Sequence, residues 1–207
     1  MRRVGVLALQ GDFEAHQKAL QQAGAEAIPV RTSEQLEQVE GLIIPGGEST
    51  TMLKLLRVEN LLEPLKRFAE VKPVFGTCAG AILLASKVTN PVQESLNVVD
   101  IDVERNAYGR QLDSRVARID AAPGFVRSGG ASEDFEAVFI RAPVIRRVGE
   151  GVKVLARFQG DPVLVEQGRH LVATFHPELT ADRSLHKLFL RKLGPETHDS
   201  PKSEQHR

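Results

Sequence analysis

The stretch Phe75-Gly76-Thr77-Cys78-Ala79-Gly80-Ala81 decides the expected fold, and it contains the only cysteine of the chain. The residues from Val71 to Phe75 predict a short buried strand, and residues 79–85 predict a helix without proline. Gly76 and Gly80 allow a tight strand-to-helix turn, because they place no bulky side chain beside the cysteine. This G-x-C-x-G pattern follows the mechanical logic of the G-x-S-x-G nucleophile elbow. Cys78 is therefore a candidate nucleophile at a helix N-terminus, although a lone cysteine can equally be a small buried hydrophobic residue.

Composition limits the functions that the chain can have. Its 207 residues include 42% hydrophobic residues, and its 27 basic and 27 acidic side chains give no net charge. We expect a single domain over residues 1–193 and a disordered tail over residues 194–207. The charge balance argues against a nucleic-acid partner, and no apolar run is long enough for a membrane span. A single cysteine and the absence of a signal-peptide pattern after Met1 predict a cytoplasmic protein.

Strands and helices are expected to alternate through the first half of the chain. Apolar runs predict strands at Val4–Leu9, Ala25–Val30 and Gly41–Ile44, with helices at 12–23 and 32–39 between them. Short connections between alternating elements favour a parallel sheet that is covered on both faces.

The second half predicts a different strand arrangement. Further strands are expected at 96–105, 112–119 and 135–141, with a loop over 121–132, and a final helix at 182–193. Three runs joined by tight turns, at 152–158, 163–167 and 171–175, predict an antiparallel meander. The fold class is therefore α/β with three layers: a mixed, mostly parallel central sheet with helices on both faces, as in flavodoxin-like proteins.

The third predicted strand leads into the loop Pro45-Gly46-Gly47-Glu48-Ser49-Thr50-Thr51. Adjacent glycines allow backbone amides to approach a ligand closely, and this loop is expected at the same sheet edge as Cys78. An ordinary turn into a helix at Met52–Leu56, capped by Ser49 or Thr50, is the alternative.

The last predicted strand leads into His176-Pro177-Glu178. Residues two apart in an extended segment project to the same side, so that a carboxylate can lie beside the imidazole. Cys78, His176 and Glu178 would then act as nucleophile, base and orienting group. The other five histidines have no metal-ligand spacing and are expected to be ordinary core or surface residues: His16, His170, His186, His198 and His206.

Three motifs together resemble the signatures of class I (triad) glutamine amidotransferases. They are the cysteine elbow at 76–80, the loop Pro45 to Thr51, and Phe175-His176-Pro177-Glu178-Leu179-Thr180. Four other segments resemble, more narrowly, the glutaminase subunits of pyridoxal 5'-phosphate synthase, and the resemblance runs from Val4 to Leu193. These segments are Leu9-Gln10-Gly11-Asp12, Val103-Glu104-Arg105-Asn106, Tyr108-Gly109-Arg110-Gln111 and Phe139-Ile140-Arg141-Ala142-Pro143.

The resemblance implies hydrolysis of L-glutamine to glutamate and ammonia through a γ-glutamyl thioester. The ammonia would pass to a separate synthase subunit that makes pyridoxal 5'-phosphate, within a large hetero-oligomer. The resemblance further implies an oxyanion hole at Gly47 and Ala79, and no cofactor or metal. Gln10 and Gly11 would form a turn that gates the site when the partner docks. Substrate contacts are implied for Gly47, Glu48, Ser49, Arg105, Ile140 and Arg141.

Other functions stay open at this point. A glutaminase that supplies a different acceptor, such as imidazole glycerol phosphate or a nucleotide, would have the same motifs. A catalytically silent binding subunit would be expected to lack part of the triad. An esterase of the α/β-hydrolase type would place the acid before the histidine, whereas Glu178 follows His176.

Overall fold

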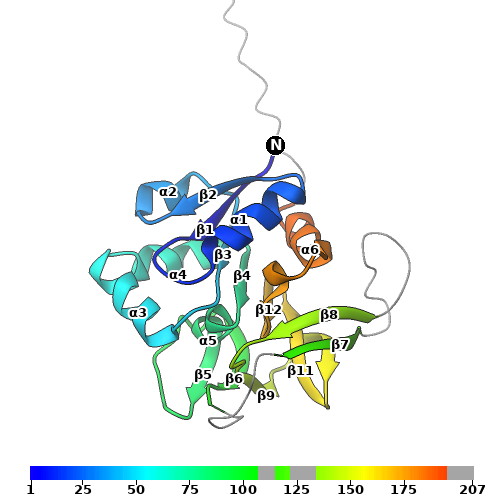
Figure 1. Ribbon diagram of the computed structural model, residues 1–207. Helices are drawn as coiled ribbons and strands as arrows, with labels where there is room; N and C mark the ends of the chain where they lie inside the picture. The colour runs from blue at the N-terminus through cyan, green and yellow to red at the C-terminus, as the bar shows by residue number, and fades with distance from the viewer. Residues whose placement is uncertain (107–114, 122–133, 195–207) are drawn as a thin grey trace, which may run out of the picture.

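The computed structural model describes residues 1–106, 115–121 and 134–194 of the chain, and its core is one large mixed sheet (Figure 1). The strands of this sheet are β1 (Arg3–Leu7), β2 (Glu26–Val30), β3 (Gly41–Ile44), β4 (Val74–Thr77), β7 (Arg115–Ala121), β8 (Asp134–Phe139), β10 (Lys153–Phe158), β11 (Asp161–Gln167) and β12 (His170–Ala173). Within the described residues these nine strands lie in the order β2-β1-β3-β4-β12-β11-β10-β7-β8. The strands from β2 to β12 in this order pair in parallel, and those from β12 to β8 pair antiparallel. The predicted meander is β10-β11-β12.

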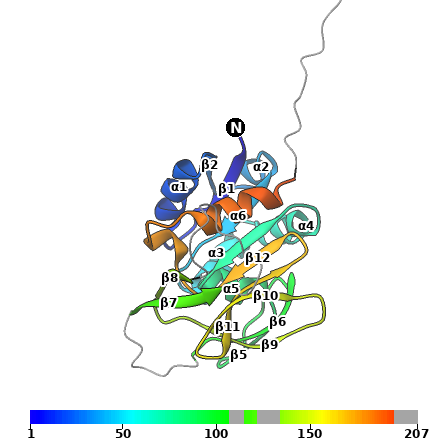
Figure 2. The same ribbon diagram turned by 90° about the vertical axis from the view of Figure 1, so that its right-hand side faces the viewer.

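Helices cover both faces of the parallel half. They are α1 (Phe13–Gln22), α2 (Ser33–Glu37), α3 (Ser49–Val58), α4 (Leu62–Val71), α5 (Ala79–Leu84) and α6 (Ser184–Lys192). The buried strand residues alternate between two apolar clusters, because successive side chains of a strand point to opposite faces. In β3, Leu42 and Ile44 join the cluster under α2, α3, α4 and α5, whereas Ile43 joins the cluster under α1 and α6. Figure 2 shows α1 and α2 on opposite sides of β1. The structure therefore confirms the predicted α/β fold.

A second, smaller sheet was not predicted. Within the described residues it contains β5 (Ala85–Thr89), β6 (Val99–Glu104) and β9 (Val144–Val148), in that order, and it lies below α5 in Figure 1. The sequence predicted β6, but it gave no strand for β5 or β9. Both are short: β5 follows directly on α5 without a turn signal between them, and two of the five residues of β9 are arginines, which interrupt the apolar pattern of a strand.

Three other boundaries differ from the prediction. Helix α4 was missed, and it includes Val71, which was assigned to the next strand. That strand starts only at Val74, because Pro73 lacks an N–H and forces Lys72 into the extended conformation that ends α4. Helix α3 begins at Ser49 and is capped by Glu48, whose carboxylate accepts from the Thr50 and Thr51 amides. The cap is therefore neither Ser49 nor Thr50.

The parallel strands bring their carboxyl ends to a common edge. Ile44 in β3 and Val172 in β12 both pair with Gly76 in β4, so that the three strands end side by side. The segments that follow β1, β3, β4 and β12 all emerge there, as a parallel sheet requires. None of the helices in the described residues is both long and apolar enough to cross a membrane. Of the loop predicted at 121–132, Ala121 is instead the last residue of β7, and residues 122–132 lie outside the described residues, as do residues 195–207 of the tail predicted at 194–207.

Candidate active site

Cys78 lies at a sharp corner between β4 and α5. Its φ of 48° and ψ of −101° place a non-glycine residue in a strained backbone region, as in a nucleophile elbow. Its amide donates to the Ala173 carbonyl of β12 at 2.9 Å, and its side chain is 7% exposed. The corner requires its two glycines: a Cβ at Gly76 would lie 2.6 Å from the Gly80 carbonyl oxygen, and a Cβ at Gly80 would lie 2.2 Å from that of Ile44.

His176 and Glu178 lie together after β12, at the start of the short 3-10 helix η2 (Pro177–Leu179). Nδ1 of His176 is 2.7 Å from Oε1 of Glu178, and both side chains are buried. Cys78 lies close enough to the imidazole to raise the pKa of the ring, and both side chains line the same cavity. The structure thus brings the three predicted residues into one chain of contacts, from thiol to imidazole to carboxylate.

The surroundings of His176 favour its charged form. Burial alone would lower its pKa, but hydrogen bonds to Cys78 and Glu178 and the negative charges of both groups outweigh burial and raise the pKa to about 10. The charged ring therefore stabilises the fold fully below about pH 6.5, and this contribution is lost as the pH rises toward 10. A thiolate paired with an imidazolium is the reactive state of a cysteine nucleophile.

Gly46 supports the imidazole from the loop after β3. A Cβ at this position would lie 2.4 Å from Cε1 and 3.0 Å from Nδ1 of His176. The first glycine of the loop is therefore needed because the His176 ring occupies the space of its missing side chain, a reason that the sequence did not reveal.

We expect Gly46→Ala to displace the His176 ring and to lower kcat/KM for glutamine about 10- to 100-fold, because ring and carboxylate no longer align. Steady-state kinetics check this result. Gly168→Ala is the matched control: a Cβ there meets nothing within 4 Å, although its φ of 55° costs some stability. A Gly46→Ala enzyme with the kinetics of the control would contradict the role of Gly46.

A cavity of about 180 Å³ opens in front of Cys78 and His176. All six residues for which substrate contacts were predicted line it: Gly47, Glu48, Ser49, Arg105, Ile140 and Arg141. The Ile140 carbonyl lies 3.9 Å from the Cys78 sulfur, and Ser49 is buried with its hydroxyl donating to Gln93 at 2.8 Å. Ala79 follows Cys78 and is fully buried as the first residue of α5. This volume suits a small metabolite.

Arg105 and Glu48 form a pair at the cavity wall. Nη2 of Arg105 lies 3.1 Å from Oε1 of Glu48. Although burial would raise the pKa of Glu48, hydrogen bonds from the hydroxyls and amides of Thr50 and Thr51 lower it to about 2, so the carboxylate stays charged. The arginine side chain is 12% exposed, and its Nε has no hydrogen-bond partner among the residues that the structure describes. Glu48 thus holds the guanidinium in place, and the Nε–H of Arg105 is without an acceptor among these residues.

Gln10 lies across the loop after β3. Its side-chain amide exchanges two hydrogen bonds with the backbone of Glu48, at 3.2 and 3.3 Å. A Cβ on Gly47, whose φ is 148°, would lie 2.4 Å from the Gln10 nitrogen. Gly11 has a φ of 83° and is packed against the Gly46 carbonyl. The two residues predicted to gate the site therefore contact the loop that contains Gly47.

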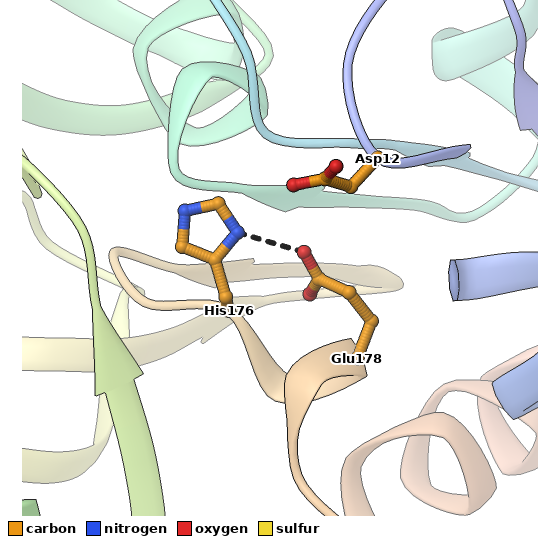
Figure 3. A group of neighbouring side chains, drawn as sticks. All are labelled: Asp12, His176 and Glu178. Atoms are coloured by element: carbon orange, nitrogen blue, oxygen red, sulfur yellow. Dashed lines mark hydrogen bonds and ion pairs between the residues drawn. The ribbon is translucent and has the colours of Figure 1, made fainter. Parts of the chain in front are cut away.

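Sequence reasoning missed several residues of the site. Figure 3 shows the Asp12 carboxylate on one side of the His176 ring, with the backbone of Glu178 on the other side. One ligand atom of each of these three residues lies within 4.8 Å of the others, which is also spacing for a cation. Asp12 could have been found from its place directly after Gln10-Gly11 at the carboxyl end of β1.

Ile82 and Asn106 also line the cavity. His16 and His186, expected to be ordinary, are buried behind Glu178.

An elbow cysteine, a histidine and a glutamate at the carboxyl edge of a parallel α/β sheet define an amidotransferase of the triad class. The chain belongs to the SNO glutamine amidotransferase family, whose model matches residues 6–194.

Relatives and one solved structure agree with this membership, and a more distant structure shares the fold alone. The chain is 64% identical over 193 residues to the pyridoxal 5'-phosphate synthase subunit PdxT of Solibacter usitatus, covering 93% of this chain and 100% of that protein. It is 49% identical to PdxT of Thermosipho africanus, covering 92% of this chain and 98% of that protein. A crystal structure of a glutamine amidotransferase, 49% identical, superposes with a TM-score of 0.84 over 93% of this chain and 99% of that one. PurLQS of Thermotoga maritima, 15% identical with a TM-score of 0.68 over 93% of this chain and 99% of that one, shares the fold.

Proposed function

We propose that this protein is the glutaminase subunit of a pyridoxal 5'-phosphate synthase, hydrolysing L-glutamine and supplying ammonia to a synthase subunit. The observation that carries the proposal is the contact chain from Cys78 through His176 to Glu178 at the wall of a small cavity. Identity of 64% to a PdxT protein over its full length supports the pathway.

In the proposed reaction, the Cys78 thiolate attacks the side-chain amide carbon of glutamine and forms a tetrahedral oxyanion. His176 then donates its proton to the leaving nitrogen, so that ammonia departs and a γ-glutamyl thioester remains. Water, deprotonated by His176, attacks the thioester, releases glutamate and restores the thiol. Glu178 keeps the ring in the orientation that both proton transfers need.

We assign the oxyanion hole to the amides of Gly47 and Ala79. Ala79 is the first residue of α5, and a first-turn amide has no acceptor within its own helix. Gly47 lines the cavity, and it belongs to the loop that Gln10 holds. One such donor is worth about 2.7 to 4 kcal/mol of barrier.

We assign binding of the substrate α-carboxylate to Arg105, with Glu48 close to the α-amino group. The uncommitted Nε of Arg105 and its planar fork support this assignment, since a carboxylate accepts two parallel hydrogen bonds from a guanidinium. Ser49, Ile140 and Arg141 complete the proposed amino-acid pocket.

We expect Arg105→Lys to raise the KM for glutamine about 10- to 100-fold with a smaller change in kcat, because a lysine retains the charge but not the fork. Initial rates across a range of glutamine concentrations check this. Arg147→Lys is the matched control, since Arg147 forms exposed ion pairs with Asp100 and Asp102 on the smaller sheet. An unchanged KM in the Arg105 variant would remove it from the substrate site.

The proposed partner is the synthase subunit, in a large hetero-oligomer, and docking would act on the turn at Gln10 and Gly11. The contact of Gln10 with the Gly47-Glu48 loop supports such gating. Measuring ammonia release from glutamine with and without the synthase subunit tests function and gating together. We expect release in the complex and a lower rate for the isolated chain. Absence of release in both would refute the function, and equal rates would refute the gating.

Co-purification distinguishes this function from a glutaminase with another acceptor. A subunit that aminates a nucleotide or imidazole glycerol phosphate would associate with that synthase instead. Intact Cys78, His176 and Glu178 argue against a silent binding subunit. Cytoplasmic localisation and the single domain over residues 1–193 stay predictions.

A further inference from the structure

Two buried histidines lie directly behind the proposed triad. His16 in α1 and His186 in α6 are both fully buried, and their helices pack against each other (Figure 2). Nδ1 of His16 lies 3.1 Å from Nε2 of His186. Buried polar groups at this distance are normally hydrogen-bonded, so the two rings form one connected pair.

The other nitrogen of His16 faces the catalytic residues. Nε2 lies 3.1 Å from the Thr77 hydroxyl and 3.2 Å from Oε2 of Glu178. Oε2 of Glu178 has no hydrogen-bond partner among the described residues. The contact from His16 to this oxygen therefore has the distance of a hydrogen bond but not its direction. Nε2 of His16 is therefore hydrogen-bonded to one group and acts electrostatically on a second, the carboxylate oxygen beside it. The first belongs to the residue directly before Cys78, and the second belongs to the triad.

The proton positions follow from the cost of burial. Nδ1 of His186 has no partner among the described residues. A buried N–H without an acceptor is rarer in proteins than an acceptor without a donor, which places the proton of His186 on Nε2. That N–H donates to Nδ1 of His16, which leaves the proton of His16 on Nε2, facing Glu178 and Thr77.

Both rings are neutral. Burial is the largest cause that holds the pKa of His16 well below its usual value, and the positive charges of His176 and Arg183 act in the same direction. Burial and the Arg183 charge lower the pKa of His186 to about 3. A neutral ring offers Glu178 a fixed dipole and leaves its negative charge available to the imidazolium of His176.

We propose that His16 is a positioning residue for the triad, whose Nε2–H dipole attracts the second carboxylate oxygen of Glu178 and, through the hydrogen bond with Thr77, fixes the strand end before Cys78. His186 acts one step further back by setting which nitrogen of His16 has the proton. The inference rests on the proposed glutaminase activity.

Two substitutions of similar size separate positioning from simple packing. His16→Gln places a carboxamide N–H near the former Nε2 and retains the donor toward Glu178. His16→Asn reaches only the former Nδ1, so it retains the contact with His186 but not that with Glu178. In the complex with the synthase subunit, we expect the Asn variant to lose about 10- to 100-fold in kcat with little change in KM, and the Gln variant to stay within about 5-fold of the wild type.

The pH profile provides a readout that packing alone does not change. The charged or titratable groups that face His176 are Cys78, Glu178 and Asp12, with neutral His16 behind Glu178. Loosening Glu178 weakens its support of the imidazolium, so the alkaline limb of kcat/KM should move to lower pH in the Asn variant only. His170→Asn is the control, since His170 in β12 accepts from the Val74 amide away from the cavity.

Alkylation of Cys78 by iodoacetamide, followed against pH without glutamine, should also change in the Asn variant only: a less well supported imidazolium stabilises the thiolate less, so the rise in alkylation rate should move to higher pH. This readout needs no turnover, so it remains interpretable if the wild-type complex releases no ammonia, a result that would count against the function alone. Equal kcat and equal alkaline limbs in the Gln and Asn variants, whether both are active or both impaired, would overturn the positioning role.

Discussion

Cys78→Ala is expected to lower glutaminase activity at least about 10⁴-fold, to the limit of detection, because no other residue can form the thioester. The chain has no second cysteine to replace it. The measurement is ammonia release from glutamine in the complex with the synthase subunit. The loss should be in kcat, since the cavity residues assigned to the amino-acid end of the substrate stay in place.

The single cysteine also allows a chemical control. One equivalent of iodoacetamide should label one site per chain and abolish activity, and glutamine should protect against labelling. The Ala variant should take up no label and should unfold within about 1 kcal/mol of the wild type, because only one sulfur atom is removed. Retention of more than about 1% of the activity by the Ala variant would end the proposed mechanism.

Glu178→Gln is expected to lower kcat about 10²- to 10⁴-fold, the second largest effect. A carboxamide can donate to Nδ1 of His176, which moves the ring proton to Nε2 and prevents the ring from accepting the thiol proton. The carboxylate is also one of the causes that raise the pKa of His176 to about 10. Without its charge that pKa falls, so the alkaline limb of kcat/KM should move to lower pH.

Glu166→Gln is the matched control for this substitution. Glu166 lies in β11 and forms ion pairs with Lys192 and Lys153 away from the cavity. Its variant should have the wild-type pH profile, apart from a small change in stability. A Glu178→Gln enzyme with unchanged kcat and an unshifted alkaline limb would show that the carboxylate does not orient the histidine.

The elements that the sequence predicted well are those with strong local signals. The capping pattern at Thr32 is a capping box with Gln35 in the structure, and Gly24, with a φ of 93°, follows α1 as a helix stop. The strands β1, β2 and β3 are mostly apolar segments that lie between such signals. Strand β5 was missed because it follows α5 without a turn between them, and strand β9 was missed because its two arginines interrupt the apolar pattern. Helix α4 was missed although Asn60 and Pro73 lie on either side of it.

The candidate site shows the same division. Cys78, His176 and Glu178 were predicted because the glycine elbow and the His-Pro-Glu spacing are short-range patterns with a mechanical meaning. The role of Gly46 was not predictable, since the ring that occupies its missing side chain is 130 positions away in the chain. His16 and His186 were taken as ordinary for the same reason: their significance comes only from contacts across 61 and 170 positions.

By itself, the sequence determined that a cysteine would lie at a strand-to-helix corner and that a histidine with a neighbouring glutamate would end a strand. Both depend on local backbone geometry, which a few consecutive residues fix. Only the tertiary structure decided that β4 and β12 are adjacent, which brings the thiol and the ring to the wall of one cavity, and that two neutral histidines lie behind the carboxylate. Burial and long-range contacts set these features, because they depend on how distant segments pack rather than on any one segment.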